Sequence, residues 1–262
     1  MKILILGASG FIGTRLSNRL QKNNQVTRLD RTTTLNEIKN YNNKFDYTIN
    51  CISSSLGAPK SISCTSNYDV PRLVRTTVQS EIWLQIDSYL QLQIPFGRRD
   101  PYTLDKQNFC NFLDNASPEQ SKVAVKHLTL PHIFGEGDRR GRLISSAIKE
   151  LAMNNNFYAS LGSQYLPILH IEDALDGIIK FMDSEQASAS CPPFWNGQVY
   201  KLLAMIQSAI GKGHVIHDKE VKSIDSDFPK ISFDKGLSDW VPQMQLDEFL
   251  IWISKQADKF SN

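Results

Sequence analysis

A tyrosine and a lysine four positions apart, Tyr102 and Lys106, have the spacing best suited to chemistry in this chain. On a helix, positions i and i+4 share one face, so the phenol and the ammonium would lie together. A neighbouring cation favours the phenolate, so Tyr102 could donate or accept a proton near neutral pH. Ser88 follows an expected strand, where its hydroxyl could bond the carbonyl oxygen that Tyr102 protonates. The alternatives are a surface Tyr–Lys pair and a turn-capping serine, and Asp87 is expected to cap that turn.

The opening segment predicts a phosphate-binding turn. A continuous apolar run over residues 3–6 is typical of a buried parallel strand, and Gly7, Gly10 and Gly13 follow it. The first glycine permits a sharp turn, the second lets a pyrophosphate approach the backbone, and the third lets the next helix pack closely on the strand. The amino end of that helix attracts phosphate. The alternative is a glycine turn with a purely structural role.

An acidic residue, Asp30, follows a short expected strand at residues 26–29. An acid about 20 residues beyond such glycines suits the ribose hydroxyls of an adenine dinucleotide. Its neighbour Arg31 could instead pair with a 2′-phosphate or stack on adenine. The sequence therefore leaves the choice between NAD and NADP open.

Strands alternate with helices through the first half, which predicts an α/β fold with a Rossmann doubly wound parallel sheet. We expect a dinucleotide-binding domain over 1–134 plus roughly 166–184, and a smaller C-terminal substrate lobe over 135–165 and 185–262. The expected strands are 2–6, 26–29, 46–51, 82–86, 123–130 and 166–171. The expected helices are 14–22, 35–40, 67–79, 102–113, 143–153, 173–182, 202–210 and 246–260, with 53–66 as a polar loop.

Composition narrows the class of protein. The 262 residues carry a net charge of +2, and no basic block suggests a nucleic-acid or membrane partner. No apolar stretch is long enough to cross a bilayer, and residue 1 leads directly into a strand, so we expect a cytoplasmic protein without a signal peptide. The four cysteines lack metal-ligand spacing, so we expect reduced thiols and no metal site: Cys51, Cys64, Cys110 and Cys191.

Together these motifs resemble the extended short-chain dehydrogenase/reductase family, in its nucleotide-sugar epimerase/dehydratase branch. The matching segments are Gly7–Gly13, Asp30, Ser88, Tyr102 with Lys106, 133–138 and 169–173. Within that branch, segments 87–89 and 100–106 most resemble a nucleotide-sugar 4-ketoreductase.

The resemblance implies roles for individual residues. Tyr102 would be the catalytic acid/base, Lys106 would bind the nicotinamide ribose, and Ser88 would orient the substrate. NAD(P)H would lie on Gly7, Gly10, Phe11, Ile12, Gly13, Asp30, Arg31, Cys51, Ile52, Ser53, Tyr102, Lys106, Pro131, His132 and Ile133. The nucleotide sugar would contact Ser88, Tyr89, Arg139, Arg140 and Arg142, although the three arginines could equally form a solvated loop. A homodimer built on the Tyr102 helix is an option in this family.

The family performs several reactions on one scaffold, so the fold does not choose between them. A 4,6-dehydratase of this family usually has an Asp–Glu pair after the Ser88 position, and here Tyr89 and Leu90 follow. The expected activity is therefore NAD(P)H-dependent reduction of a nucleotide-linked 4-keto-6-deoxy sugar for surface polysaccharide (O-antigen). The alternatives are a nucleotide-sugar 4-epimerase, which would use the same residues, and a non-catalytic dinucleotide-binding protein.

Overall fold

The computed structural model of the chain describes residues 1–30, 32–33, 37–38, 44–115, 122–138, 141–221 and 228–260. Its contacts divide the chain into two compact units. The first unit contains Met1–Leu130 and Gly177–Ser190, and the second contains Pro131–Asp176 and Cys191–Asn262.

The described part of the first unit is built on one parallel sheet of six strands. In spatial order these are β2 (Gln25–Leu29), β1 (Lys2–Leu6), β3 (Phe45–Asn50), β4 (Ser80–Ser88), β5 (Ala124–Leu130) and β9 (Ser188–Ser190). The apolar residues of β1 are fully buried, as their continuous run predicts. The two strands that follow β1 in the chain lie on opposite sides of it, β2 on one side and β3 on the other. Sheets of this kind bind ligands at the point where the strand order reverses in this way. The predicted Rossmann sheet is confirmed.

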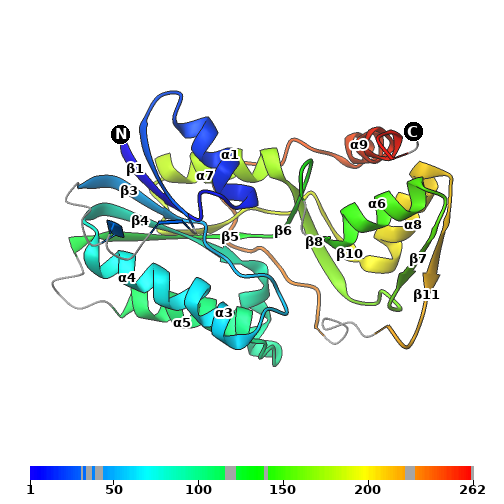
Figure 1. Cartoon of the computed structure of the whole chain (residues 1–262), viewed down its shortest axis with the longest axis horizontal. Helices are drawn as coiled ribbons and strands as arrows, with labels where there is room; N and C mark the ends of the chain where they lie inside the picture. The colour runs from blue at the N-terminus through cyan, green and yellow to red at the C-terminus, as the bar shows by residue number, and fades with distance from the viewer. Residues whose placement is uncertain are drawn as a thin grey trace. The chain divides into compact units, whose positions relative to one another are not determined.

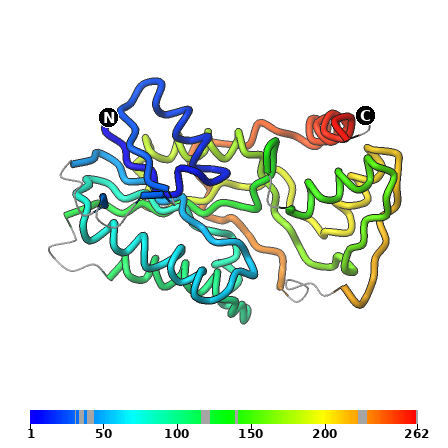
Figure 2. Tube along the Cα trace, in the orientation of Figure 1, coloured from blue at the N-terminus to red at the C-terminus, as the bar shows by residue number. Residues whose placement is uncertain are grey.

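Helices cover both faces of this sheet (Figure 1). One face carries α1 (Phe11–Leu20), and the other carries α4 (Val70–Thr77) and α5 (Pro101–Asp114). The Cα trace shows α5 running beneath the strands, on the side opposite α1 (Figure 2). Between β4 and α5 the chain forms a 3₁₀ helix, η2 (Tyr89–Phe96), which the sequence did not predict.

The prediction of a polar loop at 53–66 is wrong for residues 60–66, which are helical. Residues 60–77 form one helical run, made of α3 (Lys60–Cys64), a π-helical turn η1 (Thr65–Asp69) and α4. The polar side chains of Ser63 and Asn67 are buried there, bonded to each other. Because these partners satisfy each other inside the fold, polar composition misled the prediction. The predicted helix at 35–40 lies largely outside the described residues.

In its described part the second unit has two small sheets, three complete helices and the first residues of α7 (Ile171–Asp183). In the first sheet β8 (Tyr165–His170) lies between β6 (His132–Phe134), which is parallel to it, and β10 (Trp195–Gln198), which is antiparallel. The second pairs β7 (Asn156–Ala159) with β11 (His214–His217). The helices are α6 (Leu143–Ala152), α8 (Val199–Ile210) and α9 (Leu246–Asp258). The predicted strand at 166–171 thus forms β8 of this three-stranded sheet.

An aromatic cluster holds the core of the second unit. Phe134 makes edge contacts with Phe249 and Trp252, at centroid distances of 5.3 and 5.2 Å. Such contacts stabilise a core beyond the apolar area that they bury.

Among the described residues, no helix combines the length and apolarity that a membrane crossing requires.

The carboxyl end of α7 (Ile171–Asp183) is fixed to the first sheet by two polar side chains. The buried Lys126 ammonium on β5 donates to the carbonyl oxygens of Phe181 (2.6 Å), Met182 (3.2 Å) and Ser184 (2.7 Å). Tyr47 of β3 donates its hydroxyl to the Met182 oxygen at 2.7 Å. Burial lowers the pKa of Lys126, because it disfavours the charged ammonium. The negative end of a helix attracts a cation, and this attraction offsets part of the cost of burying the charge.

The first residues of α5 are held by a buried arginine. The Arg98 side chain is 1% exposed. Its Nε donates to Asp100 Oδ2 at 2.5 Å and to Thr103 Oγ1 at 3.0 Å. Its Nη1 donates to Gln93 Oε1 at 2.7 Å. Asp100 is also the N-cap of α5, because its Oδ1 accepts the Thr103 N–H at 3.0 Å. The point where α5 begins, and with it the position of Tyr102, therefore depends on an ion pair as well as a cap.

We expect Lys126→Met to lower the free energy of unfolding by about 2–4 kcal/mol, because three carbonyl groups at the end of α7 lose a charged donor. Urea denaturation measures the change. Lys44→Met is the matched control, since Lys44 forms an exposed pair with Glu81 and its loss should leave the midpoint unchanged. Equal effects in the two variants would contradict the helix-capping role of Lys126.

We expect Arg98→Met to lower the free energy of unfolding by roughly 3–5 kcal/mol, because it leaves Asp100 and Gln93 without their buried partner. The neighbouring variant Arg99→Met is the control, because Arg99 is exposed and donates to the backbone oxygens of Ile94 and Arg98. The same denaturation series compares them. An Arg98→Met protein as stable as Arg99→Met would show that the ion pair does not hold α5.

Candidate active site

The glycine turn is packed against the carboxyl end of β3. Gly7 has a φ of +73°, and a Cβ there would lie 2.9 Å from the Ile52 backbone nitrogen. A Cβ on Gly13 would lie 2.2 Å from the Gly7 carbonyl oxygen. The turn also donates from Gly7 N–H and Ala8 N–H to the Leu29 oxygen at the end of β2. Only glycine fits at positions 7 and 13, so the backbone itself forms the surface above the switch point.

These features fit a dinucleotide phosphate. The N-cap of α1 is Gly10, which has no side chain to bond the first N–H groups, and the first turn of α1 contains no acidic residue. Such a helix end attracts an anion through its N–H groups and dipole. The predicted contacts Phe11 and Ile12 are half-buried residues of this first turn.

Asp30 lies directly after β2, where the predicted ribose contact belongs. Its Oδ1 accepts from the backbone N–H and the hydroxyl of Thr32, at 2.9 and 2.7 Å. The carboxylate is therefore held in a fixed turn beside the glycine segment. The other predicted determinant, Arg31, lies outside the described residues.

Tyr102 and Lys106 occupy the first turns of α5 and contact two different strand ends. The Tyr102 hydroxyl lies 3.2 Å from the Ser53 hydroxyl, beyond β3. The Lys106 ammonium is 4% exposed and donates to the Ile86 carbonyl oxygen of β4 at 3.0 Å. Burial raises the pKa of the Cys51 thiol to about 12, and Lys106 opposes that shift. The structure thus brings Tyr102 and Lys106 together with the predicted cofactor segment, residues 51–53.

Ser88 is the last residue of β4 and the N-cap of η2. Its Oγ accepts the Leu90 N–H at 3.3 Å, and its own N–H donates to Gln91 Oε1 at 2.9 Å. A hydroxyl that accepts one bond keeps its hydrogen for a further acceptor. Tyr89, a predicted substrate contact, is 6% exposed. Asp87 does not cap this turn as expected, because its carboxylate contacts Cys110 and His127.

A buried amide that the sequence analysis missed fixes the segment beside Tyr102. Asn67, in the π-helical turn η1, accepts the Ser54 N–H (3.1 Å) and donates to the Ser54 hydroxyl (2.9 Å). Ser54 follows Ser53, so Asn67 sets the path of the chain that meets the Tyr102 hydroxyl. π-helical turns often occur at functional sites, but no local pattern marks this one. Arg98 was also missed, whereas Asp100-Pro101 carries a recognisable cap signal.

The remaining predicted residues belong to the second unit. Pro131 and Ile133 are buried and His132 is half-buried, all beside or within β6. Arg142 is the N-cap of α6, where its Nη1 donates to the Ile133 oxygen (3.0 Å) and its Nε lies 3.9 Å from Asp138. Arg139 and Arg140 lie outside the described residues.

The chain is similar in sequence to two proteins that carry the same name. No family model matches the chain. It is 22% identical over 205 residues to CDP-abequose synthase of Salmonella muenchen, covering 69% of this chain and 70% of the relative. It is 24% identical over 216 residues to CDP-abequose synthase of Yersinia pseudotuberculosis, covering 71% and 74%.

Solved structures share the fold. UDP-glucuronic acid 4-epimerase from Bacillus cereus, in complex with UDP-glucuronic acid and NAD, matches with a TM-score of 0.79 at 14% identity, over 99% of each chain. RMD from Pseudomonas aeruginosa, complexed with NADPH, matches with a TM-score of 0.76 at 14% identity, over 98% of this chain and 99% of the other. This chain is thus similar in sequence to proteins named CDP-abequose synthase, and it shares its fold with solved structures that include a UDP-sugar 4-epimerase and an NADPH complex.

Proposed function

We propose that this protein is an NAD(P)H-dependent reductase of a nucleotide-linked 4-keto-6-deoxy sugar, in the synthesis of surface polysaccharide sugars. The observation that carries the proposal is the anchoring of Tyr102 and Lys106 beside the 51–53 segment, which itself packs on the glycine turn. The similarity to proteins named CDP-abequose synthase supports a CDP-linked sugar as the first substrate class to examine.

In this proposal Tyr102, Lys106 and Ser88 each have a defined task. The dinucleotide, when bound, supplies the hydride. Tyr102 gives its hydroxyl proton to the substrate oxygen as that oxygen gains negative charge, and Lys106 stabilises the resulting phenolate. Lys106 has three donors, of which one holds the Ile86 oxygen, so the others can reach a ribose hydroxyl. Ser88 donates to the same substrate oxygen and fixes its position.

The residues proposed to hold the dinucleotide are those of the turn, the β2 end and the 51–53 segment. The Asp30 carboxylate suits a free ribose 2′-hydroxyl and disfavours a 2′-phosphate, so we propose NADH as the better ligand. The first unit would bind the dinucleotide and the second the sugar nucleotide, with Arg142 as the candidate diphosphate contact. Initial rates of NADH and NADPH oxidation with CDP-, dTDP-, UDP- and GDP-linked 4-keto-6-deoxy sugars test the assignment.

A nucleotide-sugar 4-epimerase would use the same residues, but it differs from a reductase in its net consumption of NADH. A reductase consumes one NADH for each sugar reduced, whereas an epimerase oxidises and re-reduces its substrate with no net change in the dinucleotide. The fold similarity to a UDP-sugar 4-epimerase is the observation that favours this alternative. Interconversion of UDP-sugars without NADH consumption would replace the reductase proposal with the epimerase one.

We expect Tyr102→Phe to lower kcat by roughly 10²–10⁴-fold, because it removes the proton donor and keeps the ring. Fluorescence titration should show unchanged NADH affinity. Tyr158→Phe is the control, because Tyr158 is an exposed tyrosine of the second unit and its loss should not affect the rate. Full activity of Tyr102→Phe would exclude the proton-donor role.

We expect Asn67→Ala to weaken NADH binding by about tenfold, because loss of a buried amide worth roughly 1–2 kcal/mol frees the Ser54 segment. Asn108→Ala on the exposed face of α5 is the control. Fluorescence titration with NADH, as for Tyr102→Phe, measures the affinity of both variants. If Asn67→Ala binds NADH as tightly as the control does, the 51–54 segment does not hold the dinucleotide.

A further inference from the structure

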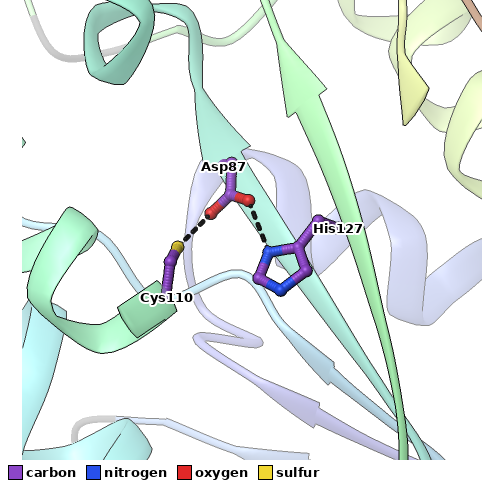
Figure 3. Close-up of side chains that lie close together, drawn as sticks. All are labelled: Asp87, Cys110 and His127. Atoms are coloured by element: carbon purple, nitrogen blue, oxygen red, sulfur yellow. Dashed lines mark hydrogen bonds and ion pairs between the residues drawn. The ribbon is translucent and has the colours of Figure 1, made fainter. Parts of the chain in front are cut away.

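A cluster of three potential metal ligands lies between β4, β5 and α5. One Asp87 oxygen, the Cys110 sulfur and one ring nitrogen of His127 lie within 4.8 Å of one another. Figure 3 shows the Asp87 carboxylate between the other two side chains, facing both. The Cys110 Sγ lies 3.1 Å from Asp87 Oδ1, and the His127 Nδ1 lies 2.9 Å from Asp87 Oδ2. The residues are far apart in sequence, so their spacing gave no motif.

The arrangement excludes a nucleophilic thiol. A Cys–His–Asp triad places the imidazole between the thiol and the carboxylate. Here the carboxylate lies in the middle, so Cys110 contacts an anion instead of a base. Burial, together with Asp87, raises the pKa of the Cys110 thiol. The cluster therefore does not activate Cys110 for attack on a substrate.

The groups around the cluster are those that support metal ligands. A ligating histidine usually donates its second N–H to a carboxylate, and the His127 Nε2 lies 3.3 Å from Asp114 Oδ1. An amide N–H directed at sulfur favours a ligating thiolate, and Gln91 Nε2 donates to Cys110 Sγ at 3.4 Å. Lys106 also favours the thiolate electrostatically. Each outer contact thus suits the form of its residue that would bind a cation.

The charges of the three ligands suit a divalent cation. A divalent cation bound by carboxylate, thiolate and neutral imidazole forms a set with no net charge, which limits the cost of burying the ion.

We propose that Asp87, Cys110 and His127 form a zinc site that joins β4, β5 and α5. Thiolate, imidazole and carboxylate together suit Zn²⁺, which has no preferred d-electron geometry. Tetrahedral Zn²⁺ separates such ligand atoms by roughly 3.3–3.6 Å, given bonds of about 2.0–2.3 Å. The two contacts to the Asp87 oxygens, at 3.1 and 2.9 Å, would widen by about half an ångström, and the three ligand atoms already lie within 4.8 Å of one another. His127 and Asp114 are 19% and 61% exposed, which gives the ion and a solvent ligand access.

Cobalt titration of the reduced, chelator-treated full chain tests the site. One equivalent of Co²⁺ should produce a sulfur-to-cobalt charge-transfer band and tetrahedral d–d bands, which Zn²⁺ should abolish. Cys110→Ser should remove the charge-transfer band. Cys64→Ser is the matched control and should keep it, because the Cys64 thiol also faces an aspartate, with its Sγ 3.5 Å from Asp69 Oδ2. A band that persists in Cys110→Ser, or no band in the parent protein, overturns the proposal.

A measurement on the unmodified chain covers the case in which Cys110→Ser does not fold. Zn²⁺ at about a hundred times its Kd should slow alkylation of Cys110, followed by mass spectrometry, by about a hundredfold. The alkylation rate of Cys191, a buried cysteine of the second unit, provides the comparison. Equal Cys110 alkylation with and without Zn²⁺ shows that the cluster is an ion-pair network only. Because this readout involves neither substrate nor dinucleotide, it is independent of the proposed reductase activity.

Discussion

The bond from the Lys106 ammonium to the Ile86 carbonyl is the interaction on which the candidate site depends. It joins the helix that carries Tyr102 to the strand that ends at Ser88, so the two hydroxyls share one rigid frame. Lys106 is almost fully buried, and a buried ammonium requires such a partner. In the proposed mechanism the same side chain is both a structural anchor and the charge that stabilises the Tyr102 phenolate.

Helix α5 is held by polar contacts along its whole length. Its first turn is bonded to Arg98 and Asp100, its middle to Ile86 through Lys106, and its last turns to Asp87 and His127. Apolar packing of Phe109 on α5 against Trp83 on β4 also holds the helix to the sheet, but without directional bonds. Directional bonds add what apolar packing lacks, since they fix the rotation and register of the helix against the strand.

The part of the candidate site at the glycine turn depends on close packing of the backbone at two glycines. The absence of a Cβ at Gly7 and Gly13 lets the first turn, the start of α1 and the end of β3 approach closely. That contact places residues 51–53 beside the turn, and Asn67 then directs the chain toward Tyr102. The glycine turn and the Tyr102 hydroxyl are thus connected through one short segment, residues 51–54.

The sequence by itself determined what local periodicity encodes: the strand–turn–helix at the start, the parallel order of strands and helices, and the shared helical face of Tyr102 and Lys106. These follow because a buried strand, a tight turn and an amphipathic helix each impose their own repeat on neighbouring residues. Only the tertiary structure decided the helical run at 60–77, the Ser54 contact of Asn67, the burial of Arg98 and the meeting of Asp87, Cys110 and His127. Those features depend on which polar side chains are buried against a partner, near or far in the chain. A polar residue that will be buried against its partner looks the same in sequence as one that faces water.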